Sequence, residues 1–379
     1  MTWMGKAQQI RRQNMKVNAV AGKLFAMLRV DGMRCCVLKG QGNALMYPNP
    51  YSRTPGDIDV WVNASREQIT EYAKKHFELG DDIRLQHLET SLDGVPVELH
   101  FFPCTMNNPI YNARLQKWFR RNADLQCSHI VGLPDGAGDI AIPTTAFNVV
   151  YQLTHLYHHF FDEGIGMRQI IDYYYVVCDF YKVYQNSSKI TPSLFTIKEG
   201  STSHPDPLTL RGEGGNRPTR CSEPLRSKDG GPSKVSPDCA GWDRLSIEGD
   251  NSAGSTTVVT SYASTALDVA QRELKYLGLW KFAGAVMYVL KEVLGLSEDK
   301  MIVPVDEKRG RLLLAEILDG GNFGRHFSKY GGFTHQSMGK KYFLKIWRNM
   351  HFVRYYPAEA LCEPLFRTWH FFWRLKYKK

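Results

Sequence analysis

The sequence predicts an α+β protein in which a mixed β-sheet with helices precedes a mainly α-helical region. Between residues 35 and 102, short apolar runs alternate with turn residues around one helical pattern, which is typical of a sheet domain. From residue 144 onward, apolar residues recur at helical spacing with one long interruption. We therefore expect a sheet domain over residues 1–143 and a helical domain over residues 144–185 and 263–379.

The first elements of the sheet domain lead to a glycine turn. Apolar residues at helical spacing predict a helix over residues 5–31. A strand over residues 35–39 follows, then a turn at Gly40 and a short helix over residues 42–47. Lys39 stands beside this turn, either as a charge that faces phosphate or as a structural lysine whose ammonium group reaches water.

Two acids follow on the next predicted strand. Because alternate residues of a strand face the same way, Asp57 and Asp59 project together, whereas Ile58, Val60 and Val62 face the other side. Two neighbouring carboxylates repel each other unless a cation or a shared proton lies between them, and a divalent metal ion is the usual solution. Oxygen ligands alone favour Mg²⁺ or Mn²⁺. The pattern therefore predicts a divalent metal site.

A third acid, Glu98, lies between Val97 and Leu99 on another apolar strand. If this strand lies beside the first, three carboxylates meet as in two-metal phosphoryl transfer, and Glu98 also helps to deprotonate an acceptor. The alternative for Glu98 is an unpaired acid at a sheet edge. The side chain of His100 points to the same side of the strand as Glu98, and it either contacts the site or only caps it.

The connections of the sheet domain carry one further candidate. A polar loop over residues 49–56 delivers Arg53, which either contacts phosphate through two parallel hydrogen bonds or pairs with one of the acids. A helix over residues 65–78 is expected next, followed by a strand over residues 82–89. The turn at Asp93-Gly94 then leads into the strand of Glu98.

Two helices of the predicted helical domain carry polar stripes. Gln152, His155 and His159 fall on one helix face, and Arg168 and Asp172 are four residues apart on the next helix. The histidines are structural, contact substrate, or form a metal pair that lacks the glutamate of His-Glu-x-x-His. Together the two stripes suit contacts to a base, a ribose or an acceptor.

Residues 186–262 differ in composition from both flanks. Gly, Ser, Pro and Thr dominate, large apolar residues are few, and no hydrophobic period persists. Such a segment cannot bury enough apolar surface to offset the entropy lost on ordering. We predict a disordered, low-complexity insertion between two helices.

Helical spacing resumes near residue 265 and recurs in three later segments, which cover residues 279–294, 312–318 and 341–352. The segment 364–379 then interleaves Trp and Phe with Lys and Arg. A helix of this kind can lie in a membrane interface, with aromatic rings at the headgroups and basic residues against anionic lipid. The alternative is that the aromatic residues dock on the helical domain.

Several motifs together resemble a known family. They are Leu38-Lys-Gly40, Tyr47-Pro48, Arg53, Gly56-Asp-Ile-Asp59 and Val97-Glu-Leu-His100. In these motifs the chain resembles the bacterial family called uncharacterised nucleotidyltransferase, within the DNA polymerase beta-like nucleotidyltransferase superfamily. The resemblance extends over roughly the first 185 residues and, more weakly, over residues 265–330.

The resemblance implies a nucleotidyltransferase fold for the sheet domain. It also implies a Mg²⁺-dependent (or Mn²⁺-dependent) enzyme that moves a nucleoside monophosphate from a nucleoside triphosphate to an acceptor hydroxyl. The implied catalytic and metal-binding residues are Asp57, Asp59 and Glu98. The implied nucleotide-binding residues are Lys39, Gly40, Gln41 and Arg53. Weaker candidates for substrate contact are His100, His155, His159, Arg168 and Asp172.

The acceptor and two rival functions stay open at this point. A sugar or lipid-linked precursor of a surface polysaccharide is one hypothesis for the acceptor. One rival is an enzyme that adds nucleotides to RNA or tRNA, gripping phosphates with its basic ends. The other is a non-catalytic binding module, since Gln41 follows Gly40 where members of the superfamily commonly carry Ser or Gly.

Charge and cysteine usage bear on partners and location. The net charge is +10, with +6 in residues 1–34 and +8 in residues 339–379. Such ends fit an anionic partner, either RNA or a membrane, or are simply a solvated basic face. The eight scattered cysteines favour reduced thiols. With no apolar run of membrane-spanning length and no secretion signal, we expect a cytoplasmic protein, with peripheral association at the inner membrane surface as a hypothesis.

Overall fold

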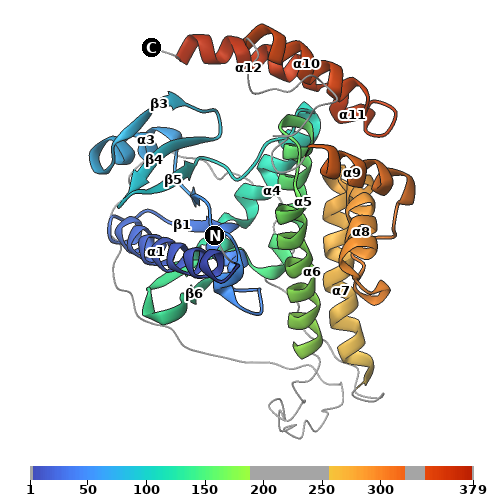
Figure 1. The fold of residues 1–379 in the computed structure, drawn as a ribbon, viewed down its shortest axis with the longest axis horizontal. Helices are drawn as coiled ribbons and strands as arrows, with labels where there is room; N and C mark the ends of the chain where they lie inside the picture. The colour runs from blue at the N-terminus through green and yellow to red at the C-terminus, as the bar shows by residue number, and fades with distance from the viewer. Residues whose placement is uncertain (1–2, 188–255, 321–337, 378–379) are drawn as a thin grey trace, which may run out of the picture. The chain divides into compact units, whose positions relative to one another are not determined.

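A computed structural model describes residues 3–187, 256–320 and 338–377 of the chain (Figure 1). Residues 1–189 and 256–379 form one compact unit, which holds all of the elements described below. Most of the predicted insertion, residues 188–255, lies outside the described residues. Its predicted limits are too wide, because the helices on both sides extend into residues 186–262.

The first half of the unit is an α+β region. Its elements are α1 (Trp3–Val30), β1 (Cys35–Leu38), α2 (Gly40–Ala44), η1 (Pro50–Ser52), β2 (Ile58–Val62), α3 (Arg66–His76), β3 (Leu79–Ile83), β4 (His87–Leu92), β5 (Val95–His100), α4 (Pro109–Ser128), β6 (Ile130–Gly132), η2 (Pro134–Gly136) and β7 (Asp139–Ala141). The order confirms the predicted sheet with helices.

Five strands form a mixed sheet in the order β1-β2-β5-β4-β3. Strands β2 and β5 pair in parallel, and the other neighbours pair antiparallel. The hairpin between β4 and β5 turns at Asp93-Gly94, where both residues have positive φ, as a two-residue type I′ turn requires. The turn predicted there is confirmed.

The two faces of this sheet pack against different helices. Ile58, Val60 and Val62 of β2 belong to the same buried cluster as the apolar face of α1. Trp61 faces the other way and packs with α4 and α5, at 6.0 Å from the ring of Phe119. The predicted alternation of β2 is therefore confirmed, and Asp59 shares the face of Trp61.

The second half of the unit is helical, as expected. Its elements are α5 (Thr145–Asp162), α6 (Met167–Ser187), α7 (Thr256–Tyr276), α8 (Trp280–Leu294), η5 (Glu298–Lys300), α9 (Glu307–Gly320), α10 (Met338–Met350), α11 (Pro357–Ala360) and α12 (Glu363–Tyr377). In Figure 1, α5 and α6 lie between the sheet and helices α7, α8 and α9. These two helices therefore form the wall that faces the sheet.

Two predicted elements differ from the structure. The strand predicted over residues 82–89 is two strands, β3 and β4, which pair antiparallel around a turn near residues 84–86. The prediction of one strand is wrong because the chain reverses there. The short helix begins at Gly40 rather than at residue 42, because the backbone already turns at Lys39 and Gly40 with φ of 52° and 37°.

Candidate functional site

The acids predicted to meet lie on neighbouring strands. The parallel register of β2 and β5 places Glu98 directly opposite Asp59. Asp57 lies immediately before β2, two residues upstream of Asp59. All three line the same cavity. The sheet thus brings together carboxylates that are separated by about forty residues in sequence.

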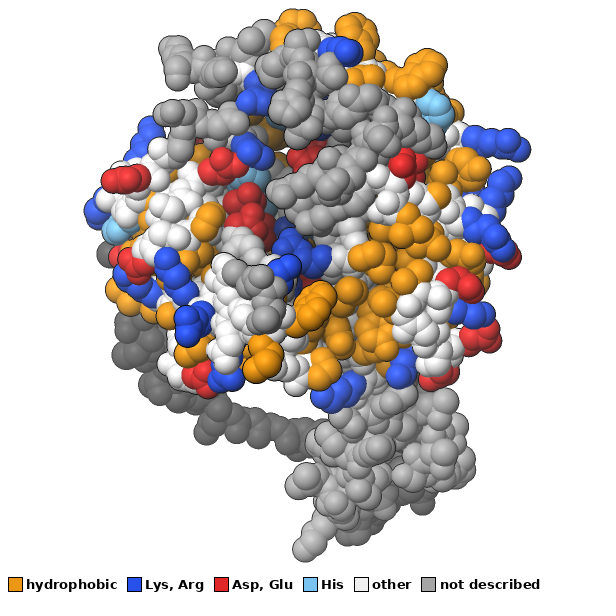
Figure 2. Space-filling model, in the orientation of Figure 1, with side chains coloured by type: hydrophobic (Ala, Val, Ile, Leu, Met, Phe, Trp, Pro, Cys, Tyr) orange, Lys and Arg blue, Asp and Glu red, His pale blue; other side chains and the backbone are white. Residues whose placement is uncertain are grey.

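This cavity has a volume of about 660 Å³ and lies between the sheet and helices α5 and α6. Such a volume is within the range for sites that bind small organic ligands. Figure 2 shows acidic, histidine and basic side chains gathered in the middle of the visible face. Of the twelve residues singled out in the sequence, eleven line the cavity: Lys39, Gly40, Arg53, Asp57, Asp59, Glu98, His100, His155, His159, Arg168 and Asp172.

Gln41 is the exception. Its side chain is buried and donates a hydrogen bond to the Oδ1 atom of Asn18 on α1. The side chain predicted to contact nucleotide therefore anchors α2 to α1 instead. Gly40, by contrast, lies at the cavity, and its positive φ explains why glycine occupies this turn.

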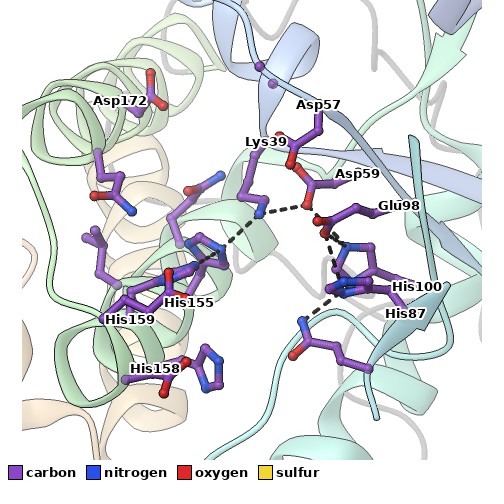
Figure 3. A pocket seen from close by; sticks show the side chains of 18 of the residues that line it. Lys39, Asp57, Asp59, His87, Glu98, His100, His155, His158, His159 and Asp172 are labelled. Atoms are coloured by element: carbon purple, nitrogen blue, oxygen red, sulfur yellow. Dashed lines mark hydrogen bonds and ion pairs between the residues drawn. The ribbon is translucent and has the colours of Figure 1, made fainter. Parts of the chain in front are cut away.

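Lys39 bridges the two walls of the cavity (Figure 3). Its Nζ atom lies 2.9 Å from Oδ1 of Asp59 and 2.9 Å from Nε2 of His155. Burial opposes its charge, but the negative charge of Asp59 outweighs burial and raises the pKa of Lys39. Lys39 also adopts a backbone conformation that non-glycine residues rarely adopt, with φ of 52°. The lysine is a fixed cation at the centre of the site.

His100 lies between two of the acids. Its Nε2 atom is 3.1 Å from Oδ1 of Asp59 and 3.2 Å from Oε2 of Glu98. Burial opposes protonation of His100, but these hydrogen bonds outweigh it and raise its pKa. Burial likewise opposes the charge of Glu98, and the hydrogen bond from His100 lowers its pKa below the ordinary value. His100 therefore contacts the site directly rather than only capping it.

His87 was missed in the sequence. It lies on β4 directly opposite His100, and its Nδ1 atom is 3.4 Å from Oε2 of Glu98. Burial is the main reason why its pKa falls to about 4, which leaves the ring neutral. The signal that could have found it is the Asp93-Gly94 turn, because a two-residue hairpin fixes which residues lie opposite each other.

The charges of the acids fit a bound divalent cation. The negative charge of Asp59, followed by burial and the charge of Glu98, raises the pKa of Asp57 to about 6. Because Asp57 is exposed at the mouth of the cavity, carboxylate repulsion is the decisive cause. Asp59 is buried, which disfavours its charge, but Lys39 and His100 hold its pKa well below the usual range. A cation beside Asp57 and Asp59 would relieve this repulsion.

The facing wall carries three histidines of α5. The Nε2 atoms of His155 and His159 lie 3.0 Å apart, and Nδ1 of His158 lies 3.1 Å from the carbonyl oxygen of Thr105. Burial lowers the pKa of all three histidines. The pKa of His159 falls to about 3. Figure 3 shows these neutral rings opposite the acids, with Lys39 between the two walls.

Arg53 pairs with Asp172 rather than with one of the acids of the sheet. Its Nε and NH2 groups donate hydrogen bonds of 2.8 and 2.9 Å to the two carboxylate oxygens. The hydroxyl of Tyr47 donates a further hydrogen bond of 2.6 Å to Oδ1 of Asp172. Two predicted site residues are thus used to join the loop before β2 to α6.

The fold and the cavity define an α+β protein whose mixed sheet presents three acids to a site walled by helices. The family model described as uncharacterised nucleotidyltransferase matches residues 1–184, which carry almost all of the residues that line the cavity. A solved structure described as an antigenic nucleotidyltransferase-like protein from Paracoccidioides brasiliensis is 16% identical, with a TM-score of 0.29. That likeness covers 42% of this chain and 75% of the other. Comparison with curated proteins gives no match.

Proposed function

We propose that this protein is a nucleotidyltransferase that moves a nucleoside monophosphate from a nucleoside triphosphate to an acceptor hydroxyl. The observation that carries the proposal is the meeting of Asp57, Asp59 and Glu98 at one cavity across β2 and β5. The match of residues 1–184 to a nucleotidyltransferase family model supports the same class of reaction. Strands β2 and β5 of the mixed sheet position Asp59 and Glu98 directly, and Asp57 stands immediately before β2.

Asp57 and Asp59 would hold a divalent metal ion, and Glu98 is close enough to share in that site. The all-oxygen donor set of the two aspartates suits Mg²⁺ or Mn²⁺. Such an ion, when bound, supplies positive charge against the triphosphate oxygens. The raised pKa of Asp57 shows the electrostatic strain that a cation would relieve.

The residues between the acids and α5 would bind the phosphates. Lys39 is a half-buried cation 2.9 Å from Asp59, and its ammonium group would contact phosphate oxygens bound in the cavity. Arg168 lines the same cavity from α6. The turn at Gly40 opens the first turn of α2, where backbone N–H groups lack helical partners. Arg53 would act indirectly, by holding the loop before Asp57.

Glu98 would receive the proton of the acceptor hydroxyl, with His100 adjusting its basicity. The hydrogen bond from His100 lowers the pKa of Glu98 in the structure described here. A carboxylate with lowered pKa is a weak base, so this bond has to loosen when substrate enters. The role of Glu98 therefore depends on the partner that His100 takes in the complex.

The C-terminal helices support a hypothesis about where the acceptor lies. Aromatic and aliphatic side chains project into solvent from α10 and α12, and they are exposed by about half or more: Phe343, Trp347, Leu365, Trp369, Phe371 and Phe372. Figure 2 shows hydrophobic side chains at the edge of the molecule that carries these helices. Arg374 and Lys376 are exposed on α12 beside them. We propose that this surface, called the C-terminal aromatic surface below, contacts an anionic membrane that carries a lipid-linked acceptor.

No helix in the described parts of the chain is long and apolar enough to cross a membrane. In the proposed contact, α10 and α12 lie at the lipid surface. The RNA alternative rests on the same basic charge, but the exposed aromatic and aliphatic side chains of α10 and α12 favour the lipid surface.

The reaction is tested by incubating the protein with each labelled nucleoside triphosphate, Mg²⁺ and cell extract, and by measuring pyrophosphate release and the labelled product. Asp59→Asn should remove Mg²⁺-dependent release while far-ultraviolet circular dichroism stays unchanged. Asp139→Asn is a matched control, since Asp139 is an exposed acid on β7 that does not line the cavity. Equal activity of Asp59→Asn and the unchanged protein would refute the proposed reaction.

A further inference from the structure

Beside the acid pair, three side chains meet in a geometry that differs from an all-oxygen site. His87, Glu98 and His100 each offer one ligand atom, and these atoms all lie within 4.8 Å of one another. Among the residues that the structure describes, no other group of three His, Cys, Asp or Glu side chains satisfies this criterion. The three come from β4 and β5, whose register places His87 opposite His100.

The distances match the edges of a metal coordination sphere. Oε2 of Glu98 lies 3.4 Å from Nδ1 of His87 and 3.2 Å from Nε2 of His100. Two ligands that are each about 2.1 Å from a metal ion lie about 3.0 Å apart at a right angle and about 3.4 Å apart at the tetrahedral angle. The two edges that meet at Glu98 therefore fit one ion, and the ligand atoms of the two histidines lie within 4.8 Å of each other.

His87 supplies an independent sign of an absent ligand. Both of its ring nitrogens are buried and have no hydrogen-bond partner, and the residue is only 8% exposed. A buried polar atom without a partner costs about 1–3 kcal/mol, so proteins rarely leave one unsatisfied. The carboxylate of Glu89 is 3.8 Å from Nε2 of His87, which is beyond hydrogen-bond distance. A metal ion at Nδ1 would satisfy this atom.

Neighbouring groups would support such a site. Oδ1 of Asp59 lies 3.1 Å from Nε2 of His100, so a fourth protein ligand, an oxygen, is close. The side chain of Gln86 lies 3.4 Å from Nδ1 of His100 and donates a hydrogen bond of 2.9 Å to the carbonyl oxygen of Pro103. This contact lies at the second nitrogen of the His100 ring, where the amide nitrogen of Gln86 is the neighbouring atom.

We propose that His87, Glu98 and His100 form a binding site for a divalent transition metal that accepts mixed nitrogen and oxygen ligands, of the Zn²⁺ type. Imidazole nitrogens select Zn²⁺ over Mg²⁺, which prefers oxygen. The site is adjacent to the acid pair and shares Glu98 with it, so the cavity would hold two chemically different metal ions. The proposal concerns metal binding by the free protein and does not depend on the transfer reaction.

The first test uses Co²⁺ as a visible substitute for Zn²⁺. Metal-free full-length protein at neutral pH should bind one equivalent of Co²⁺ and show its d–d absorption bands. Zn²⁺ should displace the Co²⁺, whereas a large excess of Mg²⁺ should not. Absence of Co²⁺ binding, or displacement by Mg²⁺ as readily as by Zn²⁺, would overturn the proposal.

Variants locate the ion. His87→Gln should weaken Co²⁺ binding more than about 100-fold, because loss of a supporting group alone costs 10-fold to 100-fold. His76→Gln, which changes a histidine of α3 stacked on Tyr72 and outside the cavity, should bind as the unchanged protein does. If His159→Gln rather than His87→Gln abolishes binding, the ion lies on the histidines of α5 and the proposal is wrong.

A second measurement covers the case in which His87→Gln does not fold. Zn²⁺-loaded His159→Gln protein keeps His87 and His100 but loses the histidine pair of α5. Its X-ray absorption fine structure should still show scattering from two imidazole rings at about 2.0 Å. A coordination shell of oxygen alone would contradict the assignment.

Discussion

Arg53 and Asp172 form a buried, two-pronged ion pair that joins the loop before β2 to helix α6. The Nε–Oδ1 and NH2–Oδ2 distances are 2.8 and 2.9 Å, and both side chains are less than one-tenth exposed. Asp57 follows Arg53 by four residues, so this pair fixes the start of the segment that carries the acids. The hydroxyl of Tyr47 adds a third contact to the same carboxylate.

We expect Asp172→Asn to destabilise the protein strongly. The substitution leaves the buried guanidinium of Arg53 without a counter-charge, and breaking a buried pair in this way costs about 3–5 kcal/mol. The free energy of unfolding in urea measures the loss. Asp124→Asn is the control, because its ion pair with Arg34 is largely exposed and should contribute no more than about 1 kcal/mol. Equal losses in the two variants would show that Asp172 has no special structural role.

The binding of Mg²⁺ should strengthen as the pH rises through about 6. The charge of Asp59 raises the pKa of Asp57 to about 6, so below that pH a proton competes with the cation for Asp57. Affinity should therefore rise between pH 5 and pH 7, by up to about tenfold per pH unit below the pKa. Isothermal titration calorimetry in two buffers should also detect release of a proton at pH 6. In Asp57→Asn protein this rise should disappear, and its persistence would assign the proton to another group.

Glu359 should make the protein less stable as the pH rises from 5 to 8. Burial raises its pKa to about 7, although it accepts hydrogen bonds from the backbone N–H groups of Asn107 and Asn108. A carboxyl group whose pKa is raised by folding contributes stability below its unfolded pKa and loses it as the pH passes the folded value.

The contribution of Glu359 amounts to about 2 to 3 kcal/mol over this range, measured as the free energy of unfolding in urea. The Glu359→Gln variant has no ionisable group at this position. Between pH 5 and pH 8 its free energy of unfolding should therefore fall by about 2 to 3 kcal/mol less than that of the unchanged protein. Glu71→Gln, on the exposed face of α3, should keep the pH dependence of the unchanged protein. A parallel pH profile for Glu359→Gln would show that the group is ionised throughout.

The C-terminal aromatic surface should bind anionic vesicles. Sedimentation with vesicles that contain phosphatidylglycerol should retain the protein, and neutral phosphatidylcholine vesicles should retain less, because the basic residues lose their partner. The variant Phe343→Ser/Trp347→Ser should lose most of the binding. Val30→Ser removes an exposed apolar side chain from the end of α1 and should not reduce vesicle binding. Retention of the double variant at the level of the unchanged protein would exclude this surface as the contact.

Much of the sheet domain is predictable from sequence because its signals are local. Strand alternation alone places Asp57 and Asp59 on the side opposite Ile58, and the Asp93-Gly94 turn marks a hairpin. His87 could also have been placed opposite His100 by counting outward from that turn. The prediction of one strand over residues 82–89 does not reveal this pairing, because the chain reverses between β3 and β4.

The sequence by itself determined that a sheet region precedes a helical region, how the acids face and where the glycine turn lies, because periodicity and backbone conformation act over a few residues. Only the tertiary structure decided which partner each charged side chain takes. Arg53 meets Asp172, and Lys39 meets both Asp59 and His155, across separations in sequence that no local pattern encodes. These pairings follow from the packing of α5 and α6 against the sheet, since a buried charge takes whichever opposite charge or lone pair the packed elements place beside it.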